Sequence, residues 1–160
     1  MSDLADRALD LLARVWARLP APLRRRTLSL ANHQVMIGVV GLLRDDDGRV
    51  LILEHRFRPP HPWGLPGGFL ERDEPPAEGL ARELREELGI EVEIEPGVFD
   101  VEYNVRGGYV SLALIARALA APRPVSREII GLRFVGSDEI PPGTYPHHAR
   151  LIAEVTARKQ

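Results

Sequence analysis

The chain has 160 residues, of which 44% are hydrophobic and 28% are charged, a composition that excludes a disordered protein and predicts one folded domain. Its 21 basic and 23 acidic residues give a net charge of −2, so no general field attracts polyanions and any phosphate recognition must be local. The absence of cysteine excludes disulfides, thiolate catalysis and sulfur-ligated metals.

The N-terminal segment has the apolar spacing of an amphipathic helix. Its apolar residues recur every three or four positions and form one stripe: Leu4, Ala8, Leu11, Leu12, Val15, Trp16 and Leu19. Pro20 and Pro22 end the helix, and the arginines at 24–26 are interpreted as part of a solvated linker. We therefore assign residues 1–30 to a helix and linker and residues 31–160 to the folded domain.

The apolar stripe of this helix must be covered. Because its polar face is not strongly basic, we expect it to pack on the domain or against a second copy of the chain in a homodimer; attachment to a membrane surface is the alternative. The sequence has neither a signal-peptide pattern nor an apolar run near the roughly 20 residues that span a bilayer. These features predict a cytoplasmic protein with no membrane partner.

Two strands are predicted at the start of the domain. The near-continuous apolar run at 33–43 predicts a strand that is buried on both faces. The aspartates at 45–47 and Gly48 have the composition of a turn, and apolar residues resume at 50–53, so we expect the two strands to form a hairpin. The segment 56–68 is rich in proline and glycine, which predicts an irregular loop.

The rest of the domain mixes helices and strands. The proline pair at 75–76 suits the first turn of a helix that runs to about Leu88, with Gly89 as its C-terminal cap. Further strands are predicted at 90–94, 98–103, 109–118 and 129–135, with a hairpin turn at 107–108, and a final helix at about 147–158 should bury Leu151, Ile152 and Val155. Because the order lacks regular βαβ alternation, it favours an α+β sandwich over a doubly wound sheet.

The first domain helix carries three glutamates at spacing i, i+3 and i+4. Glu83, Glu86 and Glu87 therefore occupy neighbouring positions on one face, opposite the apolar positions Ala77, Leu80, Ala81, Leu84 and Leu88. Like charges at this spacing repel, and a hard divalent cation that shares their oxygens would relieve the repulsion. The alternative is a solvated helix with ordinary salt bridges, because Arg82 lies four residues from both Glu78 and Glu86.

The sequence around this helix matches every fixed position of the pattern G-x5-E-x7-R-E-U-x-E-E-x-G-U, in which U is aliphatic. The matching residues are Gly68, Glu74, Arg82, Glu83, Leu84, Glu86, Glu87, Gly89 and Ile90, and the lead-in is Trp63-Gly64-Leu65-Pro66-Gly67. This segment resembles the Nudix box. The resemblance implies an α+β fold, a Nudix-type α/β/α sandwich with a mixed sheet, to which the N-terminal amphipathic helix is added.

The resemblance also implies an activity and a set of roles. It implies Mg²⁺-dependent hydrolysis, with Mn²⁺ as an alternative, of a diphosphate linkage in a nucleoside diphosphate derivative by water attack on phosphorus. Glu83, Glu86 and Glu87 resemble metal-binding carboxylates, and Arg82 resembles the residue that holds them. Gly67 and Gly68 would let the loop backbone approach the helix closely, and the resemblance places Gly67 in the metal site and Gly68 among the substrate contacts. Glu74 is expected to be an electrostatic partner at the helix start or an outer contact.

Candidates outside the box carry weaker signals. Glu128 lies six residues before Phe134, and similar spacing in nucleotide-cleaning Nudix enzymes implies an extra metal ligand; a solvated glutamate is the alternative. Arg56 and Arg58 are candidates for binding substrate phosphates, or for ordinary loop residues. Tyr103 is a candidate contact for a base or sugar, or a structural aromatic. His147 and His148 are interpreted as helix-capping or surface residues.

The main rival to an active hydrolase is a non-catalytic Nudix-fold module that binds a nucleotide. The complete set of box glutamates and arginine argues against it, since a site without turnover has no need of a repulsive carboxylate cluster. Nudix members act on nucleoside triphosphates, nucleotide sugars, dinucleoside polyphosphates, coenzymes and capped RNA. We therefore expect a small nucleotide derivative as the partner, and no nucleic acid other than a capped RNA end.

Overall fold

The computed structural model describes residues 13–23 and 35–157, and the chain divides into two units, Met1–Val35 and Met36–Gln160. In the first unit, residues 13–18 are helical and this helix ends before Pro20, as expected, whereas Pro22 lies inside a second helical stretch at 21–23. The predicted stripe residues Leu4, Ala8, Leu11 and Leu12, and the arginines at 24–26, lie outside the described residues. No helix in the described part of the chain has both the length and the apolar composition needed to cross a bilayer.

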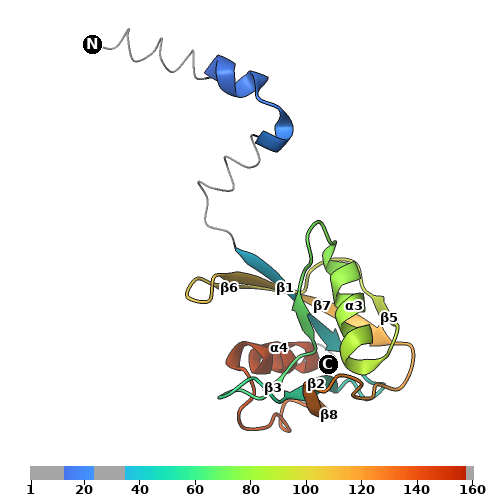
Figure 1. Ribbon diagram of the computed structural model, residues 1–160. Helices are drawn as coiled ribbons and strands as arrows, with labels where there is room; N and C mark the ends of the chain where they lie inside the picture. The colour runs from blue at the N-terminus through green and yellow to red at the C-terminus, as the bar shows by residue number, and fades with distance from the viewer. Residues whose placement is uncertain (1–12, 24–34, 158–160) are drawn as a thin grey trace. The chain divides into compact units, whose positions relative to one another are not determined.

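Between residues 36 and 157 the second unit contains eight strands and two helices (Figure 1). In chain order they are β1 (Met36–Leu43), β2 (Val50–His55), β3 (Trp63–Gly64), β4 (Gly67–Phe69), α3 (Pro76–Leu88), β5 (Val92–Ile94), β6 (Asp100–Asn104), β7 (Tyr109–Ala118), β8 (Ile129–Val135) and α4 (Pro146–Ala157). The bounds of β7 and β8 are those predicted from the sequence. Helix α3 ends, as predicted, at Gly89 in the left-handed conformation.

The strands form two sheets. The larger has the order β4-β1-β7-β5, with β6 also paired to β7, and the smaller has the order β3-β2-β8. Strands β1 and β7 are parallel, whereas β4, β5 and β6 run antiparallel to their neighbours, so the larger sheet is mixed. The predicted hairpin turn at 107–108 joins β6 to β7.

The hairpin predicted between the first two strands is wrong. The turn itself forms, with Asp45 and Arg49 joined by a backbone hydrogen bond of 3.0 Å. Strand β2 nevertheless lies in the other sheet, and only an isolated bridge between Arg44 and Val50 links the two strands. The reason is that β4 and β7 occupy both edges of β1, so β2 has no free edge of β1 to pair with.

The segment predicted as irregular loop at 56–68 contains regular structure. Trp63–Gly64 pairs with β2, and Gly67 and Gly68 begin β4, which pairs with β1. Both strands are too short to show a period-two pattern in the sequence, and their glycines favour a loop by composition. This correction matters because β4 brings the start of the box against the central strand β1.

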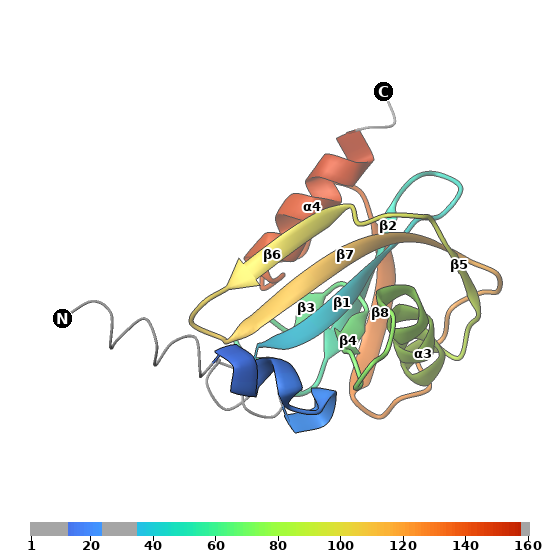
Figure 2. The same ribbon diagram turned by 90° about the horizontal axis from the view of Figure 1, so that it is seen from above.

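Alternating side chains of β1 and β2 divide between two apolar clusters. One contains Val39, Leu43, Leu51 and Leu53 together with Leu80, Leu84 and Leu88 of α3. The other contains Leu42, Val50 and Ile52 together with Leu151, Ile152 and Val155 of α4. Because neighbouring strand residues point to opposite faces, the two helices cover opposite sides of the strands (Figure 2). The predicted α/β/α sandwich is confirmed.

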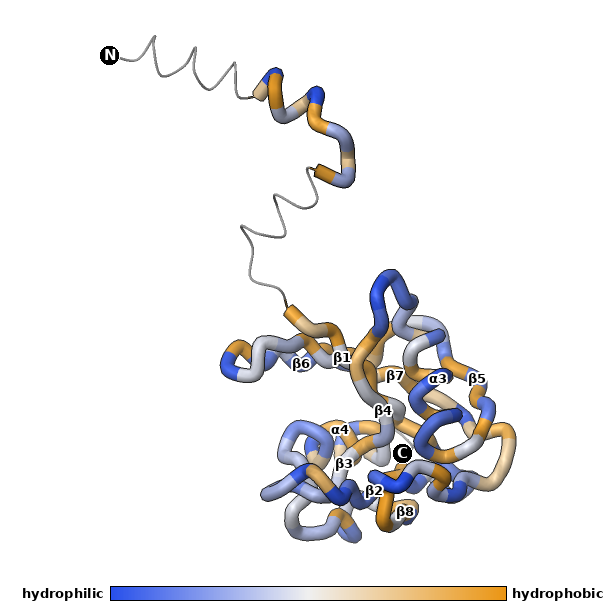
Figure 3. Tube along the Cα trace, viewed as in Figure 1, coloured by the Kyte–Doolittle hydropathy of each residue, from blue (hydrophilic) through white to orange (hydrophobic). Residues whose placement is uncertain are grey.

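Hydropathy along the trace follows this arrangement (Figure 3). Hydrophobic stretches lie in β1 and β7, and the loop that leads into α3 is strongly hydrophilic. One expectation on α3 is wrong: Ala77 is exposed, and Gly79 is the first-turn residue that packs inward, against Leu70 and Glu74. The polar face of α3 borders the loop that carries the first half of the box, because Arg82 on this face bonds to Glu74 and Phe69.

Candidate active site

Arg82 ties helix α3 to the loop before it. Its Nε and Nη2 donate to the two oxygens of Glu74, at 2.8 and 2.9 Å, and Nη2 also donates to the carbonyl of Phe69 at 3.1 Å. The second oxygen of Glu74 accepts a further bond from the backbone N–H of Glu71. These bonds hold the pKa of Glu74 down to about 2, with the Arg82 bonds as the largest cause. Glu74 is thus fully engaged as the partner of Arg82.

The remaining donor of Arg82 faces the predicted metal-binding carboxylates. Nη1 donates to Glu83 at 2.9 Å and lies 3.6 Å from Glu86. Glu83 is largely buried, whereas 62% of the Glu86 side chain is exposed. Arg82 therefore contacts three box glutamates, but its two-pronged pairing is with Glu74 and not with the predicted ligands.

Glu87 is the carboxylate that lies deepest in the site. Its Oε2 accepts a 3.0 Å bond from the backbone N–H of Gly67. Burial raises the pKa of Glu87 to about 7; the Gly67 bond and the charge of Arg58 oppose this rise, and the charges of Glu83 and Glu128 add to it. The structure thus brings Glu83 and Glu87 of the box close enough to Arg58 and Glu128, which were predicted from outside the box, for their charges to act on one another.

Two glycines make room for this arrangement. Gly67 has φ +137°, a conformation that only glycine adopts readily, and a Cβ there would overlap the carbonyl oxygen of Val39. A Cβ at Gly68 would overlap the carboxylate of Glu83. Glycine is therefore a steric requirement at Gly67, where β4 lies directly against β1, whereas a side chain at Gly68 would displace the Glu83 carboxylate.

The acidic residues fit a divalent cation chemically without converging on it in this conformation. No three histidine or acidic side chains in the described residues surround a common point at metal-binding distance. Arg82 instead holds Glu83 and contacts Glu86. The oxygen-only donor set, and a buried carboxylate whose charge is opposed by two like charges, still match what a hard cation requires.

The two predicted phosphate-binding arginines have different surroundings. Arg58 is largely buried, which lowers its pKa, and the charges of Glu87 and Glu128 oppose this decrease. Arg56 is exposed, its Nε donates to the carbonyl of Arg127, and it lines a separate surface depression. Only Arg58 thus lies beside the box glutamates.

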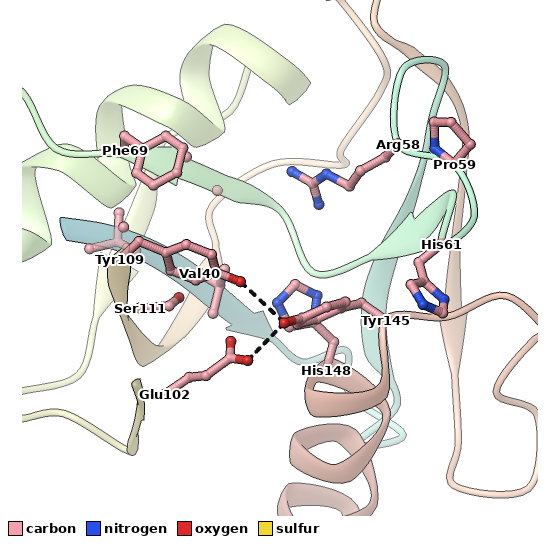
Figure 4. A pocket seen from close by; sticks show the side chains of 14 residues that line it. Val40, Arg58, Pro59, His61, Phe69, Glu102, Tyr109, Ser111, Tyr145 and His148 are labelled. Atoms are coloured by element: carbon pink, nitrogen blue, oxygen red, sulfur yellow. Dashed lines mark hydrogen bonds between the residues drawn. The ribbon is translucent and has the colours of Figure 1, made fainter. Parts of the chain in front are cut away.

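A pocket of about 360 Å³ opens next to the first half of the box. It is lined by Gly38, Val39, Val40, Arg58, Pro59, His61, Gly67, Gly68, Phe69, Glu102, Tyr109, Ser111, Tyr145 and His148. Figure 4 shows Arg58 and His61 on one side of the pocket, Phe69, Tyr109, Ser111 and Glu102 on the other, and Tyr145 between them. The pocket is therefore continuous with the surroundings of Glu87 and rich in aromatic side chains.

Tyr103 and Glu102 lie on opposite faces of β6. Tyr103, the predicted base or sugar contact, is exposed and does not line the pocket, whereas its neighbour Glu102 does. Alternation along a strand separates the two, so the register of β6 would have identified Glu102.

His148 was also misjudged as a capping or surface residue. It is 6% exposed, and its Nδ1 accepts a 3.0 Å bond from the backbone N–H of Leu65. Burial is the main cause that lowers its pKa to about 3, with the charge of Arg58 as a further cause, so the ring is neutral. The clue in the sequence was its helical spacing from Leu151, Ile152 and Val155, which places it on the buried face of α4.

Comparisons with known proteins agree with this geometry. The family model of the NUDIX domain matches residues 33–155. The chain is 35% identical over 104 residues to a MutT-like protein of Streptomyces ambofaciens, which covers 65% of this chain and 66% of that protein. It is 35% identical over 79 residues to the CTP pyrophosphohydrolase of Escherichia coli, covering 48% and 58%. The match spans just under two thirds of the first relative's length and less of the second's.

Solved structures give the same result. The crystal structure of a NUDIX hydrolase from Nitrosomonas europaea superimposes with a TM-score of 0.70 at 26% identity, over 80% of this chain and 74% of that one. A MutT NUDIX hydrolase from Burkholderia pseudomallei gives 0.61 at 28% identity, over 76% and 97%. The box, the sandwich and these likenesses point to one conclusion. The chain belongs to the Nudix hydrolase family.

Proposed function

We propose that the chain is a Mg²⁺-dependent enzyme, able to use Mn²⁺, that hydrolyses a diphosphate linkage in a nucleoside diphosphate derivative. The observation that carries the proposal is Glu87, a buried carboxylate in the field of Arg58, Glu83 and Glu128. It is bonded to Gly67, which together with Arg58 lines a pocket large enough for a small ligand. Nudix hydrolases generally use divalent metal ions, and carboxylate oxygens suit Mg²⁺ and Mn²⁺.

The residues divide the work between charge and position. Glu83, Glu86 and Glu87, with Glu128 as a further ligand, would hold the metal, which when bound supplies positive charge to the diphosphate and favours ionisation of the attacking water. Water attacks one phosphorus, and the bond between that phosphorus and the bridging oxygen breaks. Two products that each end in a phosphate then leave. Arg58 pairs with phosphate oxygens through its planar guanidinium. Arg82 and Glu74 are positioning residues that hold α3 against the loop and β4.

The proposed substrate is a small nucleotide. One relative is named a CTP pyrophosphohydrolase, and a solved structure with the same fold is named a UDP-X diphosphatase, which makes pyrimidine nucleotides the first compounds to test. A capped RNA end carries the same linkage and is the one nucleic acid that belongs in the panel. A cytoplasmic location and a homodimer formed through the N-terminal helix complete the proposal.

The test is a screen of nucleoside triphosphates, nucleotide sugars, dinucleoside polyphosphates and capped RNA with Mg²⁺ and with Mn²⁺. Product analysis in ¹⁸O-labelled water identifies the phosphorus that is attacked. We expect metal-dependent release from at least one class, with label in one product. A non-catalytic module would bind nucleotides without releasing any product, and that result would contradict the proposal.

A further inference from the structure

The pocket floor is a row of residues that crosses four strands. Register places Phe69 of β4 beside Gly38 of β1, Gly38 beside Ser111 of β7, and Ser111 beside Glu102 of β6. Directly paired residues share one face of a sheet. The two small residues in the middle therefore leave a hollow between the Phe69 ring at one end and the Glu102 carboxylate at the other (Figure 4).

Glu102 is the end point of a directed chain of hydrogen bonds. The Tyr145 hydroxyl donates to Glu102 Oε1 at 2.8 Å, so its oxygen, 3.1 Å from the Tyr109 hydroxyl, accepts the proton of Tyr109. The Tyr109 oxygen in turn accepts from Asn104 Nδ2 at 3.0 Å, and Asn104 is oriented by the bond from the Gly107 N–H to its Oδ1 at 2.7 Å. Burial, with the bonds to Tyr109 and Glu102, raises the pKa of Tyr145, which keeps this hydroxyl protonated.

We call the surface formed by Glu102, Tyr109 and Tyr145 the acceptor wall. Both of its hydroxyl hydrogens are engaged in this series of hydrogen bonds, so neither can be donated to a ligand. Each of its two hydroxyls donates to the next residue, and Glu102 Oε2 makes no hydrogen bond with any residue in the described part of the chain. A carboxylate, and two hydroxyls that already donate their hydrogens, can only accept hydrogen bonds from a ligand. Ser111, beside them in the pocket lining, makes no side-chain hydrogen bond with the described residues. The wall thus matches a ligand group that donates hydrogen bonds.

The other side of the pocket has the opposite character. Arg58 brings a cation close to Glu87, and His148, whose Nδ1 is occupied by the Leu65 N–H, carries its proton on Nε2 as a donor. Donors and a cation suit phosphate oxygens, and acceptors with aromatic rings suit the remainder of a nucleotide. The pocket is therefore polarised from a phosphate side beside the box to an acceptor side on β6 and β7.

We infer that the acceptor wall determines specificity, by taking the N–H edge of a nucleobase or the O–H edge of a ribose, with Glu102 as the direct contact and Tyr145 and Tyr109 as positioning residues. This inference rests on the proposed function and narrows it to nucleotides that donate hydrogen bonds at this point. A ligand group that presents only acceptors binds weakly, because it donates no hydrogen bond to Glu102 and its lone pairs repel the carboxylate.

The test is calorimetric binding of nucleoside monophosphates, which carry no diphosphate to cleave. CMP against UMP and GMP against IMP isolate an amino group on the base, and GMP against dGMP isolates the ribose hydroxyl. We expect wild-type protein to prefer the donor-bearing member of at least one pair by about tenfold or more. That pair identifies the source of the donor.

Variants then assign the preference to the wall. In Glu102→Gln, Tyr145 still donates to the amide oxygen, so the amide N–H₂ group faces the ligand. A preference between bases should therefore reverse, and a preference for the ribose hydroxyl should fall to within about threefold. Tyr145→Phe should weaken the preference severalfold by freeing Glu102. Glu93→Gln and Tyr103→Phe, which alter an exposed glutamate and the exposed tyrosine on the other face of β6, are the matched controls.

The inference would be overturned if folded Glu102→Gln kept the wild-type preference, or if Tyr103→Phe changed the preference equally. It would also be overturned if wild-type protein bound no monophosphate or discriminated within no pair. The proposed function is judged separately, because metal-dependent product release depends on the box and not on which monophosphate binds. An active enzyme with no role for Glu102 would therefore refute the inference alone.

Discussion

The first residues of the box and the acceptor wall line the same pocket, but the box and the wall are built in different ways. The box is continuous in sequence, from Gly68 to Ile90. Its Arg82 pairs with Glu74, Glu83 and Glu86, whereas burial raises the pKa of Glu87. The wall comes from β6, β7 and the residue before α4, and its hydrogen bonds form a complete chain. In the proposed function, hydrolysis uses a carboxylate cluster that a cation completes, whereas selectivity uses a rigid surface of defined polarity.

The largest effect should come from removing single charges in the box. We expect Glu86→Gln and Glu87→Gln each to lower kcat by at least about 100-fold with the fold retained, because a metal-organised electrostatic contribution is lost. Steady-state product release and circular dichroism measure the two quantities. Glu78→Gln, on the first turn of the same helix, should stay near the wild-type rate. Wild-type rates in both site variants would remove these residues from the reaction.

The second prediction concerns the backbone beneath the box. Gly67→Ala should lower the free energy of unfolding by at least about 3 kcal/mol, because alanine is strained at φ +137° and its methyl group would overlap Val39. Gly108→Ala is the control: its φ is +67° with open space around it, and a cost of only about 1 kcal/mol is expected. Equal losses in urea denaturation would show that β4 tolerates displacement.

The raised pKa of Glu87 makes stability depend on pH in metal-free protein. The folded pKa of about 7 lies above the unfolded value of 4.5, so the stabilising effect is complete below about pH 4.5 and is lost as pH rises through 7. The loss should reach up to about 3 kcal/mol. Glu87→Gln should abolish it, and the difference between the two proteins isolates Glu87, because His55 and His148 titrate in both. Parallel stability curves from pH 5 to 8 would contradict the burial of this carboxylate.

The box could be predicted from the sequence because its information is local. The spacing of Glu83, Glu86 and Glu87 fixes their shared face on any helix, and Gly89 marks the end of that helix. The long apolar strand β1 and the inward face of α4 follow in the same way from periodicity. A one-dimensional pattern is sufficient wherever residues that act together are a few positions apart.

The acceptor wall could not be predicted because its information is distributed. Tyr145 and Glu102 are 43 residues apart, and their contact depends on sheet order and on where α4 begins. The wrong hairpin shows the same limit, since the turn at 45–48 was correct and the partner strand was decided by β4 and β7. Side chains alternate between the two faces of β6, so the register of this strand decides that Glu102 and not Tyr103 faces the pocket.

The smallest effect on catalysis should come from the N-terminal helix. Deleting residues 1–20 leaves both the box and the acceptor wall intact, so kcat should change by less than about threefold if the account of the pocket is right. We expect full-length protein to be a dimer at tens of micromolar and the deletion variant to be a folded monomer. Light scattering of both proteins measures this. A full-length monomer would refute the dimer and favour packing of the helix within its own chain.

We propose that the box glutamates form the site of a divalent cation. The most direct test is titration of Mn²⁺ at pH 8, followed by the electron paramagnetic resonance signal of the free ion, in wild-type protein and in the Glu83→Gln, Glu86→Gln, Glu87→Gln triple variant. We predict saturable binding to wild-type protein and loss of that binding in a variant that remains folded. Equal Mn²⁺ affinity in the two proteins would place the cation elsewhere and contradict the account.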